Sequence, residues 1–226
     1  MNNHRKYSLA AGILYLITFV SIPTLALYTH AHDLNFITGA GPDAPIILGG
    51  ILEIIVALAG IGTAVALYKV VKRQNGAVAL GFVGSRTLEA STIFAGVVCL
   101  FSLVTLRQAG VGAGGVVTGQ ALAAMYDRFF LGQNLMPVVN ALLLGTLMYK
   151  SRLVPRFLPI LGFIGAPLLL AATIIGLFND GMKASGVLTF GFLPIAAWEL
   201  LLGIWLTFKG FNKSAITTLS QKTGTD

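Results

Sequence analysis

Residues 45–68 read PIILGGILEIIVALAGIGTAVALY, an apolar run whose only charged side chain is Glu53. A helix of about 20 residues spans the hydrocarbon core of a bilayer, so this run is long enough for one crossing. No water is available in that core to pair the backbone amides, and the alternating pattern of a membrane barrel is absent. The run therefore predicts a transmembrane helix.

Runs of the same kind recur along the whole chain. The predicted spans are 8–28, 45–68, 77–105, 128–149, 157–178 and 186–208. The composition agrees, with 56% hydrophobic residues, 10% charged residues and a mean hydropathy of +0.84. We predict an all-α integral membrane bundle of six transmembrane helices, forming a single multi-pass membrane domain over residues 1–226.

The basic residues indicate how this bundle is oriented. The formal net charge is +7, which in a soluble chain would suggest nucleic acid, but here the Lys and Arg residues fall in short connections between spans. We therefore expect a lipid bilayer as partner and no nucleic acid. One side collects Arg5, Lys6, Lys69, Lys72, Arg73, Lys150, Arg152, Arg156, Lys209, Lys213 and Lys222. The positive-inside rule then places both termini in the cytoplasm, with 210–226 as a polar cytoplasmic tail of a cell-membrane protein.

Two segments allow other interpretations. Residues 1–31 have the basic start and small residues of a signal peptide, although their apolar stretch is longer than a typical signal core; cleavage would leave five spans. The connection 106–127 contains GVGAGG at 110–115, which formally matches a dinucleotide-binding fingerprint. That fingerprint works only between a strand and a helix, so we interpret the segment as a flexible external loop.

Four ionisable side chains lie inside the predicted spans: Glu53, Arg86, Glu89 and Glu199. At 1.5 Å per residue they lie about 18, 13, 18 and 15 Å from the cytoplasmic face, near one plane at mid-membrane. Arg86 and Glu89 are three residues apart on one helix, and Glu53 and Glu199 could converge on the same guanidinium. Charge at this depth requires partners or a function, so this group is the candidate proton or solute site.

Polar and small residues share the faces of these charges. Glu53 lies in a stripe of small residues that favours close helix packing, which predicts that the stripe faces protein. The supporting polar or pocket residues are Ser85, Thr92, Gln133, Asn140 and Trp198. Pro137 marks a possible kink between Gln133 and Asn140. Three carboxylates against one Arg leave an excess of negative charge, so at least one Glu is expected to be protonated.

Catalytic and metal-binding signals are weak. His30, His32 and Asp33 crowd one predicted loop, but a solvated loop explains them better than a metal site does. Cys99 is the single cysteine and lies in an apolar segment. The zinc-protease and serine-hydrolase motifs are absent, and no histidine lies at membrane depth. We expect no catalytic residues, no metal and no cofactor.

Several short motifs resemble one known family. They are GILYLITF at 12–19, ALY at 66–68, KRQN at 72–75, SLVTLRQ at 102–108, LVPR at 153–156, LGFIGAP at 161–167, PIAAWE at 194–199 and KGF at 209–211. Together they resemble the bacterial membrane family labelled domain of unknown function 4386, from about Tyr7 to Phe211. Lys69 stands where that pattern suggests a proline. The resemblance implies an integral membrane protein of prokaryotic type, and it implies no catalytic residue.

Three hypotheses of function remain open. The first is a proton-linked transporter or permease for a small solute of unknown identity, with a site between two halves of three spans; no broken-helix signature is visible, and the small size favours a homo-oligomer. The second is a non-catalytic scaffold, sensor or partner subunit in which the buried charges form a structural clamp. The third and weakest is an intramembrane lipid-modifying enzyme that uses glutamate acid–base chemistry.

Overall fold

The computed structural model describes residues 3–22, 24–33, 35–39, 41–178 and 187–222, and this part of the chain is helical with no strand. The helices are α1 (Asn3–Thr18), α2 (Thr24–Leu27), α3 (Ala44–Val71), α4 (Gly76–Gln108), α5 (Val116–Gln133), α6 (Met136–Ser151), α7 (Phe157–Phe178), α8 (Val187–Phe208) and α9 (Lys213–Lys222). Three 3-10 turns, η1 (Phe19–Ser21), η2 (Thr29–His32) and η3 (Gly112–Gly115), join some of them. The all-α prediction is confirmed for these residues.

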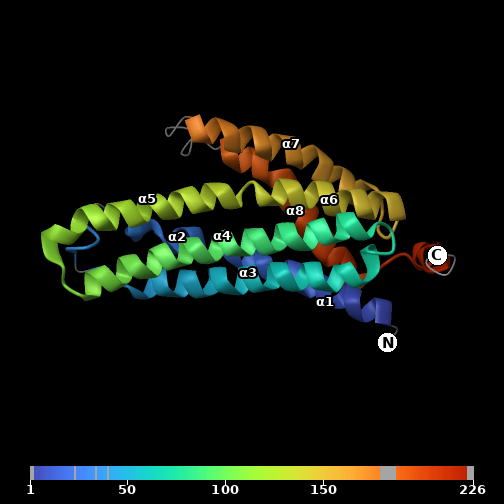
Figure 1. Ribbon diagram of the computed structural model, residues 1–226, viewed down its shortest axis with the longest axis horizontal. Coiled ribbons are helices and arrows are strands. Elements are labelled where there is room, and N and C mark those ends of the chain that lie inside the picture. Colours follow the sequence, from blue (N-terminus) through green and yellow to red (C-terminus); the bar gives the residue numbers. More distant parts are fainter. Residues whose placement is uncertain (1–2, 23, 34, 40, 179–186, 223–226) are drawn as a thin grey trace.

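The long helices form a closed ring. In order around the ring, α1 packs on α3, α3 on α4, α4 on α6, α6 on α7, α7 on α8, and α8 again on α1. α5 lies outside this ring along the far half of α4, and it continues into α6 as one long bent rod (Figure 1). The interior of the ring therefore receives side chains from elements that are far apart in the sequence.

Membrane crossing can be assessed from length and composition. Within the described residues, the segments long and apolar enough to cross a bilayer are 44–71, 76–108, 112–151, 157–178 and 190–208. Apolar side chains such as Leu58, Leu80 and Val98 are exposed on the outside of the bundle, as expected for surfaces that face lipid. These findings agree with a membrane protein.

The first predicted span, 8–28, is not one continuous helix. α1 ends at Thr18, and the chain continues as η1 and then as α2. The hydroxyls of Thr18, Ser21 and Thr24 donate to the carbonyls of Tyr15, Thr18 and Ser21, so each hydroxyl bonds the carbonyl three residues before it. These bonds pair the hydroxyl donors within the segment itself where the helix is interrupted, as polar groups away from water require. The expectation of no broken helix was wrong.

The prediction that residues 106–127 form a flexible loop was also wrong. Only 109–115 is non-α, because its glycines permit a tight turn in which Gly110 and Gly112 have positive φ. The chain then forms α5 from Val116. The predicted fourth span, 128–149, accordingly consists of the end of α5 and most of α6, with a break at 134–135 just before Pro137. Proline fits the first turn of a helix, which explains why α6 begins there.

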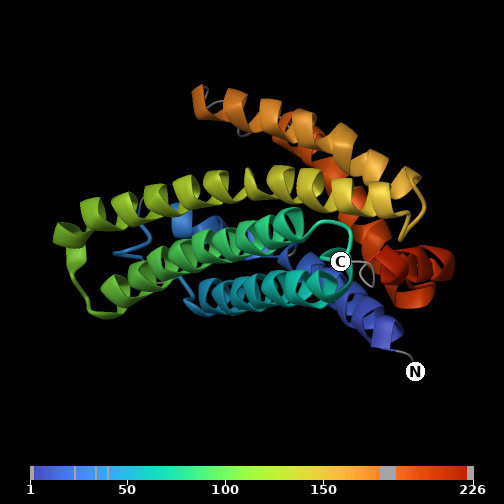
Figure 2. The ribbon, with the colours of Figure 1, turned by 45° about the vertical axis from the view of Figure 1, so that its right-hand side comes forward.

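The basic connections gather at one end of the bundle. The start of α1, the α3–α4 and α6–α7 connections and α9 all lie at the right-hand end of Figures 1 and 2. Arg5 at this end donates to the carbonyls of Leu206 (2.9 Å) and Thr207 (2.6 Å), where α8 leaves carbonyls unpaired. The basic segments from which the orientation was predicted therefore lie together at one end of the molecule.

The segment predicted as a polar tail, 210–226, contains a helix. Residues 213–222 form α9, whose Ala215 and Leu219 are 7% and 2% exposed and belong to the main core cluster. Four-residue spacing puts both side chains on one face of the helix. Asn212 N–H donates to Leu153 O at 2.9 Å, which links this segment to the α6–α7 connection. Residues 223–226 lie outside the described residues.

Candidate functional site

The centre of the ring holds Arg86 of α4, which is 3% exposed. Its Nη1 donates to Glu89 Oε2 at 2.9 Å, one helical turn further along α4. Its Nη2 donates to Glu199 Oε1 of α8 and to the hydroxyl of Tyr15 of α1, the latter at 3.3 Å. Asn140 Nδ2 of α6 donates to Glu89 Oε2 at 2.8 Å. Four helices thus contribute to one bonded network, which we call the central cluster: Tyr15, Arg86, Glu89, Asn140 and Glu199.

Aromatic rings enclose the guanidinium. Its carbon lies 5.3 Å from the centroid of the Tyr15 ring and 5.9 Å from that of Phe82, which is four residues earlier on α4. Cations over aromatic faces at such distances are attracted to the ring quadrupole. A planar guanidinium with five donors suits this mixture of rings and carboxylates, whereas a Lys ammonium would reach fewer of them.

The central cluster retains unused hydrogen-bonding capacity. Arg86 Nε and Asn140 Oδ1 are buried and have no hydrogen-bond partner among the described residues, and the same is true of the Ser85 hydroxyl on the adjoining turn. Buried polar groups in native proteins are paired in the great majority of cases. A donor, an acceptor and a hydroxyl are therefore available to water or to a polar ligand.

Charge at the cluster does not cancel. One guanidinium faces two carboxylates, Glu89 and Glu199, whose side chains are each 12% exposed. With both carboxylates ionised the cluster carries one excess negative charge. Insertion scales set the cost of such a charge at about 2.5–3.5 kcal/mol, so a proton or a cationic group bound there stabilises the protein.

Glu53, the fourth predicted member, is placed elsewhere. It is 4% exposed, and its Oε1 lies within hydrogen-bonding distance of Thr24 Oγ1 of α2, at 2.9 Å. On α3 the residue opposite Arg86 is Gly60, where an added Cβ would lie 4.0 Å from Arg86 Cδ. Seven residues separate Glu53 from Gly60, or about 10 Å along the helix. The expected convergence of Glu53 on Arg86 is therefore not observed.

The supporting residues behave differently from one another. Thr92 Oγ1 bonds the backbone carbonyl of Glu89 at 2.7 Å rather than its carboxylate. Trp198, 1% exposed, points at α7, where an added Cβ on Gly162 would lie 3.4 Å from its indole. Gln133 ends α5 and makes no hydrogen bond to the cluster within the described chain. Of the supporting residues, only Asn140 thus bonds a charged side chain of the central cluster, whereas Ser85 and Trp198 are the chain neighbours of Arg86 and Glu199.

Tyr15 and Phe82, which lie at the central cluster, were not predicted from the sequence. Phe82 had a visible signal, because it precedes Arg86 by four residues and so shares its helix face. Tyr15 is a polar aromatic residue within the first predicted span, but nothing in its spacing relates α1 to α4. Thr24, Tyr28 and Tyr126, which lie around Glu53, were also missed.

The histidine pair of the sequence also has a definite place. His32 Nε2 lies 3.0 Å from Asp127 Oδ1 of α5, while His30 lies 3.2 Å from Asp33. The hydrogen bond to Asp127 raises the pKa of His32 above its ordinary value of 6.5. Among the described residues no group of three or more His, Cys, Asp or Glu side chains could hold a metal ion.

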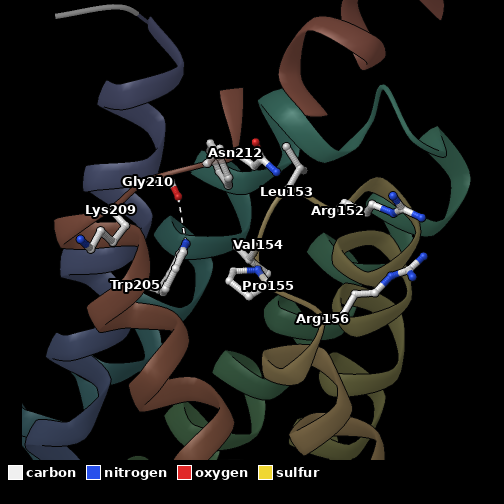
Figure 3. Close-up of a pocket in the computed structure, with 10 residues that line it drawn as sticks. Arg152, Leu153, Val154, Pro155, Arg156, Trp205, Lys209, Gly210 and Asn212 are labelled. Atoms are coloured by element: carbon white, nitrogen blue, oxygen red, sulfur yellow. Dashed lines mark hydrogen bonds between the residues drawn. The ribbon is translucent and has the colours of Figure 1, made fainter. Parts of the chain in front are cut away.

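A cavity of about 580 Å³ opens at the basic end of the bundle (Figure 3). It lies between the α6–α7 connection and the end of α8, and its lining includes Arg152, Arg156, Lys209, Trp205 and Asn212 but no carboxylate. Arg152 and Arg156 extend from one rim and Lys209 lies at the other. Such a basic rim suits the anionic headgroups of a membrane surface.

The comparison with family models decides the identity of the chain. Residues 10–210 match the model described as Domain of unknown function (DUF4386). The chain belongs to the DUF4386 family. The match includes every member of the central cluster and confirms the resemblance drawn from the short motifs. Comparisons with curated proteins and with solved structures gave no match.

Proposed function

We propose that this DUF4386 protein is a small proton-linked transporter or permease of the cytoplasmic membrane, with the central cluster as its proton and solute site. One observation carries the proposal: a buried Arg86 binds two carboxylates from different helices while unpaired polar atoms remain beside it. One proton balances the excess negative charge of the two carboxylates. A solute that binds there and alters this charge changes the affinity for the proton, and the two movements are then linked.

The interrupted first segment supports transport. Transporters commonly form their binding sites from discontinuous helices, because a break frees backbone groups inside a protein-lined interior. Here the break between α1 and α2 lies beside Glu53, and α1 itself supplies Tyr15 to the central cluster. We propose that α1, η1 and α2 together make the sixth crossing, with both termini on the cytoplasmic side, as the basic end of the bundle favours.

The alternative is a non-catalytic scaffold or partner subunit with a structural polar core. The observation in its favour is that Arg86 is held from several directions, by two carboxylates, the Tyr15 hydroxyl and two aromatic rings. The rim of Arg152, Arg156 and Lys209 would then serve to contact anionic lipid. Neither function assigns a catalytic residue or a cofactor, and a homo-oligomer is compatible with both.

Proteoliposomes that enclose a pH-sensitive dye test the transport proposal. A panel of small amines, amino acids, carboxylates and sugars is added outside, and the change in internal pH is recorded. We expect at least one solute class to move protons in the wild type, and Glu199→Gln to abolish the response. Thr87→Val, an exposed position on α4, is the matched control and should leave it unchanged.

Stability measured across pH separates transport from a clamp. Wild type, Glu89→Gln and Glu199→Gln are unfolded thermally from about pH 5 to 9. A titrating site predicts a pH dependence in the wild type that one variant loses while remaining folded. If both variants unfold at every pH and no solute moves protons in the wild type, the clamp is correct and transport is excluded for the panel tested.

A further inference from the structure

A second polar cluster surrounds Glu53 on the side of the bundle opposite the basic end. Its members are Glu53 of α3, Thr24 of α2, Tyr28 just before η2, and Tyr126 of α5, and they are 4%, 0%, 2% and 7% exposed. The rings of Tyr28 and Tyr126 meet edge to face, with centroids 5.3 Å apart. Tyr28 also covers Gly49, one helical turn before Glu53, with its hydroxyl 3.1 Å from where a Cβ would lie. We call this group the outer cluster.

The hydroxyl of Thr24 indicates the protonation state of Glu53. Thr24 Oγ1 is within hydrogen-bonding distance of both Ser21 O and Glu53 Oε1. A hydroxyl has one proton to donate, and the carbonyl of Ser21 can only accept. With Glu53 ionised, one of the two contacts lacks a proton. With Glu53 protonated, the carboxyl donates to Thr24 and Thr24 donates to Ser21, so both hydrogen bonds form.

The electrostatic surroundings favour the same state. Glu89 has Arg86 as a direct partner, whereas no cationic side chain of the described chain acts on Glu53, whose interactions are its burial and Thr24. The titratable groups that face it are the phenols of Tyr28 and Tyr126, and a phenol is ordinarily neutral at physiological pH. An unpaired carboxylate at this depth is costly, and binding a proton removes the charge.

The two phenols provide groups through which a proton can move. Tyr28 OH and Tyr126 OH are buried and have no hydrogen-bond partner in the part of the chain that the structure describes. A phenol hydroxyl both donates and accepts, so each can take a place in a chain of hydrogen bonds with water. Structural phenols are normally paired when buried. Two unpaired phenol hydroxyls near one carboxyl therefore point to a ligand of this site, which we identify as a proton carried by water.

A path to the surface starts at the same residues. His32 lies one helical turn after Tyr28, and its Nδ1 is 3.3 Å from Tyr28 O. Asp127 directly follows Tyr126 and contacts His32 Nε2 at 3.0 Å. The His32 and Asp127 side chains are 42% and 38% exposed, so the pair reaches solvent. The His32 ring also lies beside the Tyr126 ring, with centroids 6.3 Å apart, so groups that exchange protons with water lie close to one of the two phenols.

We propose that Glu53 is a second proton-binding site of this protein besides the central cluster, that it carries a proton in the structure described, and that it exchanges this proton with the outer solution past Tyr28, Tyr126, His32 and Asp127. On release, the carboxyl O–H bond breaks, Glu53 keeps the electron pair as a carboxylate, and the proton passes to water. The inference rests on the proposed function for its biological meaning, because it adds to the Arg86 site a proton site with its own path to solvent.

Infrared spectroscopy of the purified protein tests this directly. A protonated carboxyl in an apolar site has a carbonyl band distinct from that of a carboxylate. We expect this band in the wild type at neutral pH, loss of the Glu53 contribution to it in Glu53→Gln, and retention of that contribution in Glu89→Gln and Glu199→Gln. Glu53→Gln should stay folded, because the amide can donate to Thr24 as the carboxyl does. A band that is unchanged in Glu53→Gln overturns the proposal, because the protonated carboxyl then belongs to the central cluster alone.

A second variant keeps the test decisive if Glu53→Gln does not fold. Tyr126→Phe removes a hydroxyl without a protein partner, so the fold and the band should remain while the band exchanges with heavy water more slowly. Unchanged exchange in both Tyr126→Phe and Tyr28→Phe contradicts the proposed path. These measurements need no transported solute. Failure to find a solute would therefore leave the Glu53 result standing, and loss of the Glu53 assignment would leave solute-linked proton movement to the central cluster.

Discussion

Replacing Arg86 by methionine should destabilise the protein strongly, because it removes the only cation in direct contact with Glu89 and Glu199 in the described structure. Charge-assisted hydrogen bonds contribute about 1.5–3 kcal/mol each, and breaking a buried ion pair by removing one partner costs about 3–5 kcal/mol. Arg86 makes two such bonds and a third to Tyr15. We expect Arg86→Met to lower the free energy of unfolding by about 3–5 kcal/mol.

The same reasoning predicts a rescue. When both carboxylates are neutral, the cation is no longer needed to balance them, and neutral replacement of a buried ion network is often without cost. Arg86→Met combined with Glu89→Gln and Glu199→Gln should therefore recover most of the loss. The stability of Arg86→Lys should lie between that of the wild type and that of Arg86→Met, because an ammonium keeps the charge but cannot reproduce the planar fork of donors.

Reversible unfolding by SDS in mixed micelles measures these differences. Trp198 and Trp205 both lie on α8 and provide a fluorescence signal next to Glu199. Lys150→Met, which removes an exposed cation, is the control and should change stability by less than about 0.5 kcal/mol. If Arg86→Met costs no more than this control, or if the triple variant is as unstable as the single one, Arg86 does not balance the two glutamates.

Three further predictions concern other parts of the fold. Gly12→Ala should cost about 1–3 kcal/mol, because its Cβ would lie 2.6 Å from Thr207 N and 2.8 Å from Gly203 O, whereas Gly84→Ala, with open space, should not lower the melting temperature. Because the pKa of His32 is raised, its contact with Asp127 should stabilise the protein fully below about pH 6.5, and this stabilisation should be lost as the pH rises through the raised pKa. Both side chains are exposed, so the contribution should stay below about 1 kcal/mol. His32→Gln should remove this pH dependence from the melting temperature. Leu219→Ala should detach α9 and abolish hydrogen-exchange protection over 213–222. Thr218→Ala, at an exposed position, is the control and should leave that protection in place. Equal protection in the two variants would show that α9 is not held by its buried face.

The helical architecture and much of the central cluster could be predicted from the sequence. Apolar length forces helices in a bilayer, and the spacing of Arg86 and Glu89 puts them one turn apart on any helix. The stripe around Glu53 was predicted to face protein, and its residues Ala57 and Ala64 are 1% and 0% exposed. These features follow from local periodicity, which is the information that a single sequence carries best.

The depth of Glu53 could not be predicted by the same counting. The estimate assumed that 45–68 fits the membrane from one face to the other, but α3 continues to Val71 and α4 has 33 residues, about 50 Å, well beyond a core of about 30 Å. Helices that overhang the core shift every depth counted from their ends. The convergence of Tyr15 with Arg86 depends on ring closure between α1 and α8, which no local pattern encodes.

The broken first segment did leave a local signal that was not used. Thr18, Ser21 and Thr24 recur every three residues, and each bonds the carbonyl three positions back. Next to Pro23, which lacks an N–H, this spacing of hydroxyls is typical of a chain that must satisfy its own backbone where a helix stops. Long apolar runs that contain this pattern should be divided before spans are counted.

Closure of the ring by α1 and α8 has a consequence for biosynthesis. Tyr15 is made near the start of translation and Glu199 near its end, yet both bind the same guanidinium. While the chain is being inserted, Arg86 can find Glu89 on its own helix but must wait for the last crossing to find Glu199. The central cluster is therefore completed only when α8 docks against α1, and a polypeptide released before that point exposes an unfinished polar core that membrane quality control can recognise.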